Sequence, residues 1–78
     1  MNLKLTKHFQ DMVQHRGLSI EHVKQAIRNP DEKEGVFEGK IRVKKDVGGK
    51  TIEVVYCKEK FRDKKEEYII ITAYYISV

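Results

Sequence analysis

The spacing of apolar residues changes once along the chain, near residue 40, and this change constrains the fold more than any other feature. Before it, apolar residues recur at helical spacing, on one face of an α-helix. After it, apolar and polar residues alternate, as they do along a β-strand with one buried face. The sequence therefore predicts an α+β fold with two N-terminal helices followed by a three- to four-stranded antiparallel sheet.

Two short helices are expected within residues 6–28, at residues 6–16 and 20–28, and the short link between them favours a helical hairpin or a sharply angled pair. Thr6 and Ser19 are suitable N-caps, because their hydroxyls can accept hydrogen bonds from free backbone amides of the first helical turn. Gly17 is a suitable end for the first helix. Pro30 ends the second, since proline disfavours helix in the residue before it.

The antiparallel sheet is expected over residues 36–76. Val36-Phe37 predicts a short edge strand, and Gly48-Gly49 predicts a hairpin turn. The run from Tyr68 to Ile76 is apolar on both faces, which is typical of a central strand. The charged segment Lys58–Glu67 before it is expected to be a solvated loop or a twisted hairpin tip.

The hairpin turn also predicts the register of its two strands. It places Val43 opposite Val54 on the core face of the sheet. On the other face Lys44 lies opposite Glu53, an exposed pair worth about a few tenths of a kcal/mol. Arg42 faces an apolar residue there, so it and Lys40 are expected to be the more available cations. Three basic side chains are expected to bind a nucleic acid: Lys40, Arg42 and Lys44.

Composition excludes several classes of protein. With 78 residues and no internal linker or repeat, residues 1–78 are expected to form a single domain. No apolar run is long enough to span a bilayer, and the N-terminus lacks the apolar stretch of a signal peptide. The only cysteine, Cys57, cannot form an internal disulfide, which fits a reducing compartment. We therefore expect a cytoplasmic protein with no membrane partner.

The positive charge lies in one half of the chain. Residues 40–78 contain ten basic and six acidic residues, a difference of four, which equals the net charge of +4 of the whole chain. A basic half favours an acidic partner, most commonly a nucleic acid. The alternative is a charge that only maintains solubility.

We expect neither a metal ion nor a cofactor. The three histidines, His8, His15 and His22, are seven residues apart, which is not the spacing of a helical zinc pair. His15 and His22 project away from the apolar stripes of their helices and are expected to be solvated. The two glycines of the hairpin have neither phosphate-loop nor dinucleotide spacing.

The remaining polar residues suit RNA cleavage without a metal. Such cleavage needs a base for the 2′-hydroxyl, an acid for the leaving 5′-oxygen and cations for the phosphate. His8 is a candidate acid or base; alternatively, its ring packs on Met12. Arg16 lies at the centre of an apolar stripe and is a candidate phosphate ligand, or else it caps its helix or pairs with a carboxylate. Tyr74 is a candidate catalytic group, and its alternative role is sheet packing.

The order of these features resembles the domain of unknown function 4258 family. The residues that carry the resemblance are His8, Arg16-Gly17-Leu18-Ser19, Val23, Asn29-Pro30 and Ile70-Ile71-Thr72-Ala73-Tyr74. That family is similar to the BrnT branch of RelE-like toxins, which have a comparable turn before the second helix. Their last strand carries an Ile-Ile-Ser-Ala-Arg-like run.

The resemblance implies a RelE-like fold and an RNA-cleaving toxin that an antitoxin protein neutralises. The matched positions are His8, Arg16 and Thr72, and Tyr74 stands where the BrnT-like run has arginine. We therefore expect His8, Arg16 and Tyr74 to be catalytic and Thr72 to join the basic residues that bind RNA.

Two other functions remain open at this stage. The chain can be a non-catalytic module that binds nucleic acid or protein. It can also be an interaction protein with no role on nucleic acid, which forms a homodimer or heterodimer through its tyrosine-rich last strand.

Overall fold

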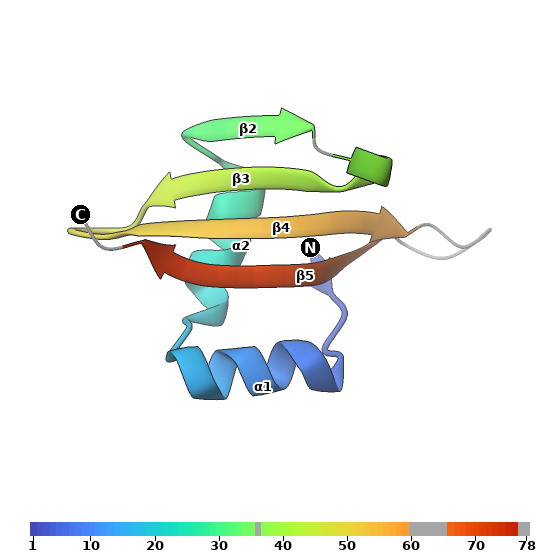
Figure 1. The fold of residues 1–78 in the computed structure, drawn as a ribbon, viewed down its shortest axis with the longest axis horizontal. Helices are drawn as coiled ribbons and strands as arrows, with labels where there is room; N and C mark the ends of the chain where they lie inside the picture. Colours follow the sequence, from blue (N-terminus) through green and yellow to red (C-terminus); the bar gives the residue numbers. More distant parts are fainter. Residues whose placement is uncertain (36, 60–65, 77–78) are drawn as a thin grey trace.

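The computed structural model describes residues 1–35, 37–59 and 66–76. A five-stranded mixed sheet with the order β1-β5-β4-β3-β2 forms one layer of the fold (Figure 1). Along the chain the elements are β1 (Asn2–Leu3), α1 (Lys7–Arg16), α2 (Ile20–Arg28), β2 (Glu32–Gly35), the 3-10 turn η1 (Phe37–Gly39), β3 (Ile41–Asp46), β4 (Thr51–Glu59) and β5 (Glu67–Ile76). The predicted α+β class and its two N-terminal helices are confirmed.

The helices begin and end where their capping residues predict. The hydroxyl of Thr6 accepts a hydrogen bond of 3.1 Å from the Phe9 amide, and the hydroxyl of Ser19 accepts one of 3.3 Å from the His22 amide. Gly17 ends α1 with a φ of 60°, in the left-handed region that glycine adopts without strain. These local signals therefore determine the bounds of both helices.

The β3–β4 hairpin has the predicted register. Val43 lies opposite Val54, and Lys44 lies opposite Glu53. The Val47 amide donates to the Lys50 carbonyl at 2.9 Å, which closes the turn at Gly48 and Gly49. Both of these glycines have positive φ, as a tight hairpin turn requires.

The predicted sheet of three to four antiparallel strands was wrong, because a strand is added at each edge. At one edge β1 pairs with β5 in parallel, through Asn2 and Leu3. At the other edge β2 pairs with β3 in the antiparallel direction. A two-residue strand and a strand that reads Glu-Lys-Glu-Gly have no β-pattern of their own. Pairing with their neighbours therefore decides their conformation.

The edge strand expected at Val36-Phe37 was also wrong. Phe37 lies in η1, Val36 lies outside the described residues, and the strand covers Glu32–Gly35 instead. Glu38 and Gly39 have left-handed backbone conformations, which turn the chain out of β2 and into β3. A turn in this place leaves no room for a strand at Phe37.

The segment expected to be a charged loop is partly sheet. β4 continues to Glu59 and β5 begins at Glu67, while residues 60–65 lie outside the described part of the chain. β4 occupies the centre that was expected for the last strand. β5 has a strand on its outer side at only two positions, and α1 lies along that side further on (Figure 1).

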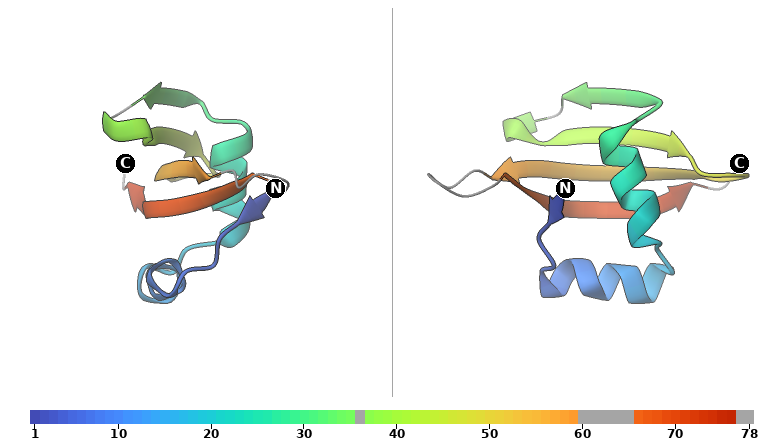
Figure 2. Two further views of the ribbon diagram at one scale, coloured as in Figure 1. Left: turned by 90° about the vertical axis from the view of Figure 1, so that its right-hand side faces the viewer. Right: turned by 180° about the vertical axis from the view of Figure 1, so that it is seen from behind.

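Within the described residues, the helices cover one face of the sheet, and the other face, here called the open face, has no helix on it. α2 crosses the back of the sheet and packs on β3 and β4, whereas α1 packs beside β5 (Figure 2). The buried apolar side chains between the sheet and the helices are Phe9, Met12, Leu18, Val23, Ala26, Ile27, Val43, Ile52, Val54, Tyr56, Ile70 and Ala73. Burial raises the pKa of the Tyr56 phenol, as expected for a core tyrosine. Neither helix of the described chain has the length and apolar character needed to cross a membrane.

Asp31 attaches the start of β2 to the end of β3. Its carboxylate accepts a hydrogen bond of 2.8 Å from the Asp46 amide and one of 3.2 Å from Lys45 Nζ. The Asp46 amide first and the Lys45 ammonium second lower the pKa of this carboxyl from its usual 3.8. The ionised carboxylate therefore contributes to the stability of the edge.

We expect Asp31→Asn to lower the thermal unfolding midpoint at neutral pH, and the difference from wild type to disappear in acid. A lowered pKa contributes stability above the pKa of the unfolded carboxyl. This contribution is lost as the pH falls below about 3.8 and through the folded pKa. Thermal unfolding over a series of pH values measures it. Asp11→Asn, at an exposed position of α1, is the control. A difference that persists unchanged at the lowest pH contradicts this role.

Candidate active site on the open face of the sheet

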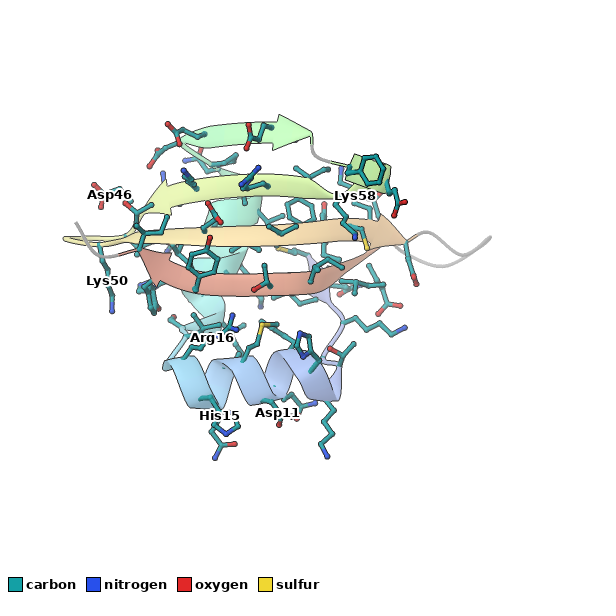
Figure 3. All side chains as sticks on the ribbon, viewed as in Figure 1. Asp11, His15, Arg16, Asp46, Lys50 and Lys58 are labelled. Carbon is teal, nitrogen blue, oxygen red and sulfur yellow. The ribbon has the colours of Figure 1, made fainter. Side chains whose placement is uncertain are left out.

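Two rows of side chains cross the open face of the sheet, one residue from each of the strands β2, β3, β4 and β5 (Figure 3). The first row is Glu32, Lys44, Glu53 and Tyr74, and the second is Glu34, Arg42, Val55 and Thr72. Residues directly opposite one another on neighbouring strands point to the same face. The strand register therefore places charged side chains of β2, β3 and β4 beside the hydroxyl groups of β5.

Glu53 is the buried centre of the first row. Only 6% of this residue is exposed, although neither α1 nor α2 covers its face. The Tyr74 hydroxyl donates a hydrogen bond to Glu53 Oε2, and Lys44 Nζ lies 3.7 Å from Glu53 Oε1. A carboxylate in such a place needs these partners, because an unpaired buried charge is costly. Its burial also corrects the exposed Lys44–Glu53 pair expected from the sequence.

Tyr74 is the solvent-facing member of this pair, with 38% of its surface exposed. Its pKa is raised above 10.0, first by the hydrogen bond to Glu53 and then by desolvation and by the charge of Glu53. Arg42 and Arg16 act on the same phenol with a smaller, opposite effect. A phenol and a carboxylate thus share a hydrogen bond between two guanidinium groups, and this arrangement can move a proton inward from a bound hydroxyl.

Arg16 approaches Tyr74 from α1. Its Nη1 donates to the Ala73 carbonyl at 3.0 Å and to the Thr72 hydroxyl at 3.1 Å, and it lies 3.5 Å from the sulfur of Met12. Within the described residues, its Nε and Nη2 have no hydrogen-bond partner. The guanidinium is therefore held in place by one nitrogen and presents its other donors to solvent, as a bidentate phosphate contact requires.

Arg42 and Lys44 are paired with carboxylates of β2. Arg42 Nε lies 2.8 Å from Glu34 Oε1, and Lys44 Nζ lies 3.9 Å from Glu32 Oε2. The prediction that Arg42 is a more available cation was therefore wrong. The unforeseen strand β2 supplies its carboxylate partner.

The structure brings together most of the predicted site residues. Arg16, Thr72, Tyr74, Arg42 and Lys44 lie on or beside the open face. Lys40 lies two residues before Arg42, and its side chain has no ion pair within the described residues.

Within the described residues, no hydrogen bond or ion pair joins His8 to this cluster. His8 is exposed near the start of α1, about 12 Å along the helix axis from Arg16.

Sequence patterns alone did not single out Glu53 as a functional residue. It is the only acidic residue in the otherwise apolar run Ile52–Tyr56, which is the signal that could have marked it. Its pairing with Tyr74 depends on the register between β4 and β5, which the sequence does not show.

His22 was expected to be solvated, and this was wrong. Its Nδ1 lies 2.9 Å from the hydroxyl of Tyr75, which also accepts a hydrogen bond of 3.0 Å from the Ser19 amide. Lys50 Nζ lies 3.9 Å from the centre of the Tyr75 ring. Tyr75 thus holds the turn between the helices from the covered side of the sheet, opposite Tyr74. This turn directly follows Arg16 and so helps to position it.

We expect Tyr75→Phe to lower the free energy of unfolding by about 1–2 kcal/mol, because the part-buried amide of Ser19 loses its acceptor. Denaturant unfolding measures this loss. Tyr68→Phe is the matched control, since within the described residues the Tyr68 hydroxyl makes no hydrogen bond, and its effect should be below about 0.5 kcal/mol. Equal losses in the two variants would show that the hydrogen bond from the Ser19 amide to Tyr75 does not contribute to the free energy of unfolding.

Tyr74 should make stability depend on alkaline pH. Because its pKa is raised in the folded state, the bond to Glu53 contributes stability below the unfolded value of about 10, and this contribution is lost as the pH rises through the folded pKa. We expect Tyr74→Phe to be less stable than wild type at neutral pH and the two proteins to converge in strong alkali. Urea unfolding at rising pH measures the difference, and curves that stay parallel would contradict the shared proton.

The fold and this cluster define an α+β protein whose sheet is covered on one face and carries a candidate acid–base pair with arginines on the other. The model of the family described as domain of unknown function (DUF4258) matches residues 5–75, so the chain belongs to this family. The comparison with curated proteins found no match, and the comparison with solved structures found none. Within the described residues, no three His, Cys, Asp or Glu side chains are grouped to hold a metal ion.

Proposed function

We propose that this protein is a metal-independent endoribonuclease with a RelE-like arrangement. We further propose that it acts in the bacterial cytoplasm as a toxin that an antitoxin protein neutralises. The observation that carries the catalytic part is the hydrogen bond between Tyr74 and the buried Glu53, beside the anchored guanidinium of Arg16. The resemblance to BrnT and RelE-like toxins supports the biological part.

In the proposed reaction the 2′-oxygen of the substrate attacks the adjacent phosphorus. Its proton passes to the oxygen of Tyr74 while the phenol proton passes to Glu53, so the phenol stays neutral. The bond from phosphorus to the 5′-oxygen breaks, and the 5′-oxygen takes a proton from water. The products are a 2′,3′-cyclic phosphate and a 5′-hydroxyl. Glu53 later returns its proton to solvent through Tyr74.

Arg16 is the proposed ligand of the reacting phosphate. Its Nη1 is engaged by β5, which restricts the guanidinium without consuming its remaining donors. A fixed, planar cation stabilises the extra negative charge of a phosphorane better than a mobile one, because little reorganisation is needed during the reaction. Thr72 orients this guanidinium rather than binding RNA itself.

The second candidate is a nucleic-acid-binding module without catalysis. The observation that favours it is the excess of positive charge in residues 40–78, with ten basic and six acidic residues, which suits an acidic ligand without requiring catalysis. This candidate predicts salt-dependent RNA binding with no cleavage.

The test uses the purified chain with single-stranded RNA in EDTA, together with growth and RNA integrity after induced expression. We expect wild type to cleave RNA and to arrest growth. Tyr74→Phe and Arg16→Lys should each lose about tenfold or more of the cleavage rate, because one removes the proton relay and the other the arginine fork. His15→Ala, whose side chain points away from the sheet (Figure 3), is the control. His8→Ala should have a smaller effect than Arg16→Lys.

Thermal unfolding establishes that each variant is folded. Intact RNA with folded wild-type protein and normal growth would end the ribonuclease proposal. Binding without cleavage would select the second candidate. Cleavage that requires a divalent metal would exclude the proposed mechanism.

A further inference from the structure

Strand β2 places two carboxylates on two cations of β3. Glu34 lies opposite Arg42 and Glu32 lies opposite Lys44 in the sheet register, so all four side chains point to the open face. The Arg42–Glu34 ion pair measures 2.8 Å and the Lys44–Glu32 pair 3.9 Å. The cations nearest to the candidate active site along the sheet are thus already occupied by anions of the same chain.

These contacts are suited to exchange. Residues of both strands line a depression of about 210 Å³ on the surface: Glu32, Lys33, Glu34, Arg42 and Lys44. Arg42 Nε is shielded from solvent, yet its contact with Glu34 lacks the direction of a good hydrogen bond, so the pair is held by charge alone. The Glu34 side chain is 62% exposed and the Arg42 side chain 38%, so water reaches the pair from the carboxylate side, and pairs that water reaches are weak.

The spacing of the two carboxylates points to the chemistry of their competitor. Glu32 and Glu34 are two residues apart on one strand, which places them about 6.6 Å apart on the same face. Successive phosphates of an extended single-stranded nucleic acid have a similar separation. We propose that Glu32 and Glu34 mark two phosphate subsites of single-stranded RNA, over Lys44 and Arg42. In the free protein their carboxylates occupy these subsites and the RNA must displace them.

This proposal rests on the proposed function for its choice of RNA as the ligand. β3 lies two strands from β5, about 10 Å across the sheet, so these subsites hold phosphates beyond the one beside Tyr74. Glu53 also lies 3.7 Å from Lys44, but it is buried and stays in place when RNA is bound. The acidic edge strand therefore limits the affinity of the site, while Glu53 belongs to its chemistry.

The test measures binding of a short, fluorescein-labelled 2′-O-methyl RNA, which lacks the reacting hydroxyl and cannot be cleaved. We expect the double variant Glu32→Gln with Glu34→Gln to bind about three- to tenfold more tightly than wild type at low salt, because two weak internal ion pairs no longer compete. The matched control is Glu21→Gln with Asp11→Asn. It makes the same change in net charge on exposed positions of the helices, and Glu21 has an ion pair of 3.3 Å and the same exposure as Glu34. The control should change the RNA affinity by less than about twofold, because salt screens charges that lie far from the bound RNA.

A second arm repeats both pairs of substitutions in a chain that carries Arg42→Gln and Lys44→Gln. If the carboxylates compete for these cations, the tightening by Glu32→Gln with Glu34→Gln shrinks to the size of the control. Equal tightening by this pair and by the control in the wild-type background would overturn the proposal while leaving RNA binding intact. Failure of every chain to bind would overturn the proposed function as well. If Glu32→Gln with Glu34→Gln tightens binding as expected but wild type does not cleave ordinary RNA, the ribonuclease proposal alone fails. The phosphate subsites are then still supported.

Discussion

The contact between Arg16 and the outer edge of β5 organises the whole molecule. β1 covers this edge at only two positions, and further along the strand the Ala73 carbonyl points outward to α1 instead of to another strand. The Arg16 guanidinium satisfies that carbonyl and the Thr72 hydroxyl together. A buried carbonyl without a donor is costly, so a cation at the end of α1 replaces a missing strand. The same contact brings α1 to the sheet and a charged donor to the open face.

The residues around Arg16 then have structural tasks that explain the turn from Arg16 to Ser19. Gly17 ends α1 in a left-handed conformation, Leu18 is buried in the core, and Ser19 caps α2. The Tyr75 hydroxyl accepts a hydrogen bond from the Ser19 amide on the covered face of the sheet. The run Arg16-Gly17-Leu18-Ser19, which carries part of the family resemblance, therefore has a structural role: it joins the two helices to the last strand. Any activity at the open face depends on this junction, because it sets the position of the guanidinium.

Local signals in the sequence predicted the helices and the β3–β4 hairpin, because caps and tight turns act over a few residues. The pairing of Tyr74 with Glu53 could not be predicted in this way. The segment that joins β4 to β5 contains no glycine or proline to define a turn, and a bulge shifts the register between Val55 and Tyr56. A shift of one residue moves every later side chain to the opposite face. Strand β2 was missed for a related reason, since its charged residues become a strand only by pairing with β3.

The sequence by itself determined the α+β class, the bounds of both helices and the hairpin register, whereas Thr72 became a candidate only through the resemblance to a family. The class, the bounds and the register follow from periodicity, capping or turn chemistry over short distances. Only the tertiary structure decided that Glu53 is buried against Tyr74 and that β2 neutralises Arg42 and Lys44. These properties depend on contacts between segments that are distant in the sequence. Packing of the whole chain therefore determines the partner of each charged residue, and no single segment does so.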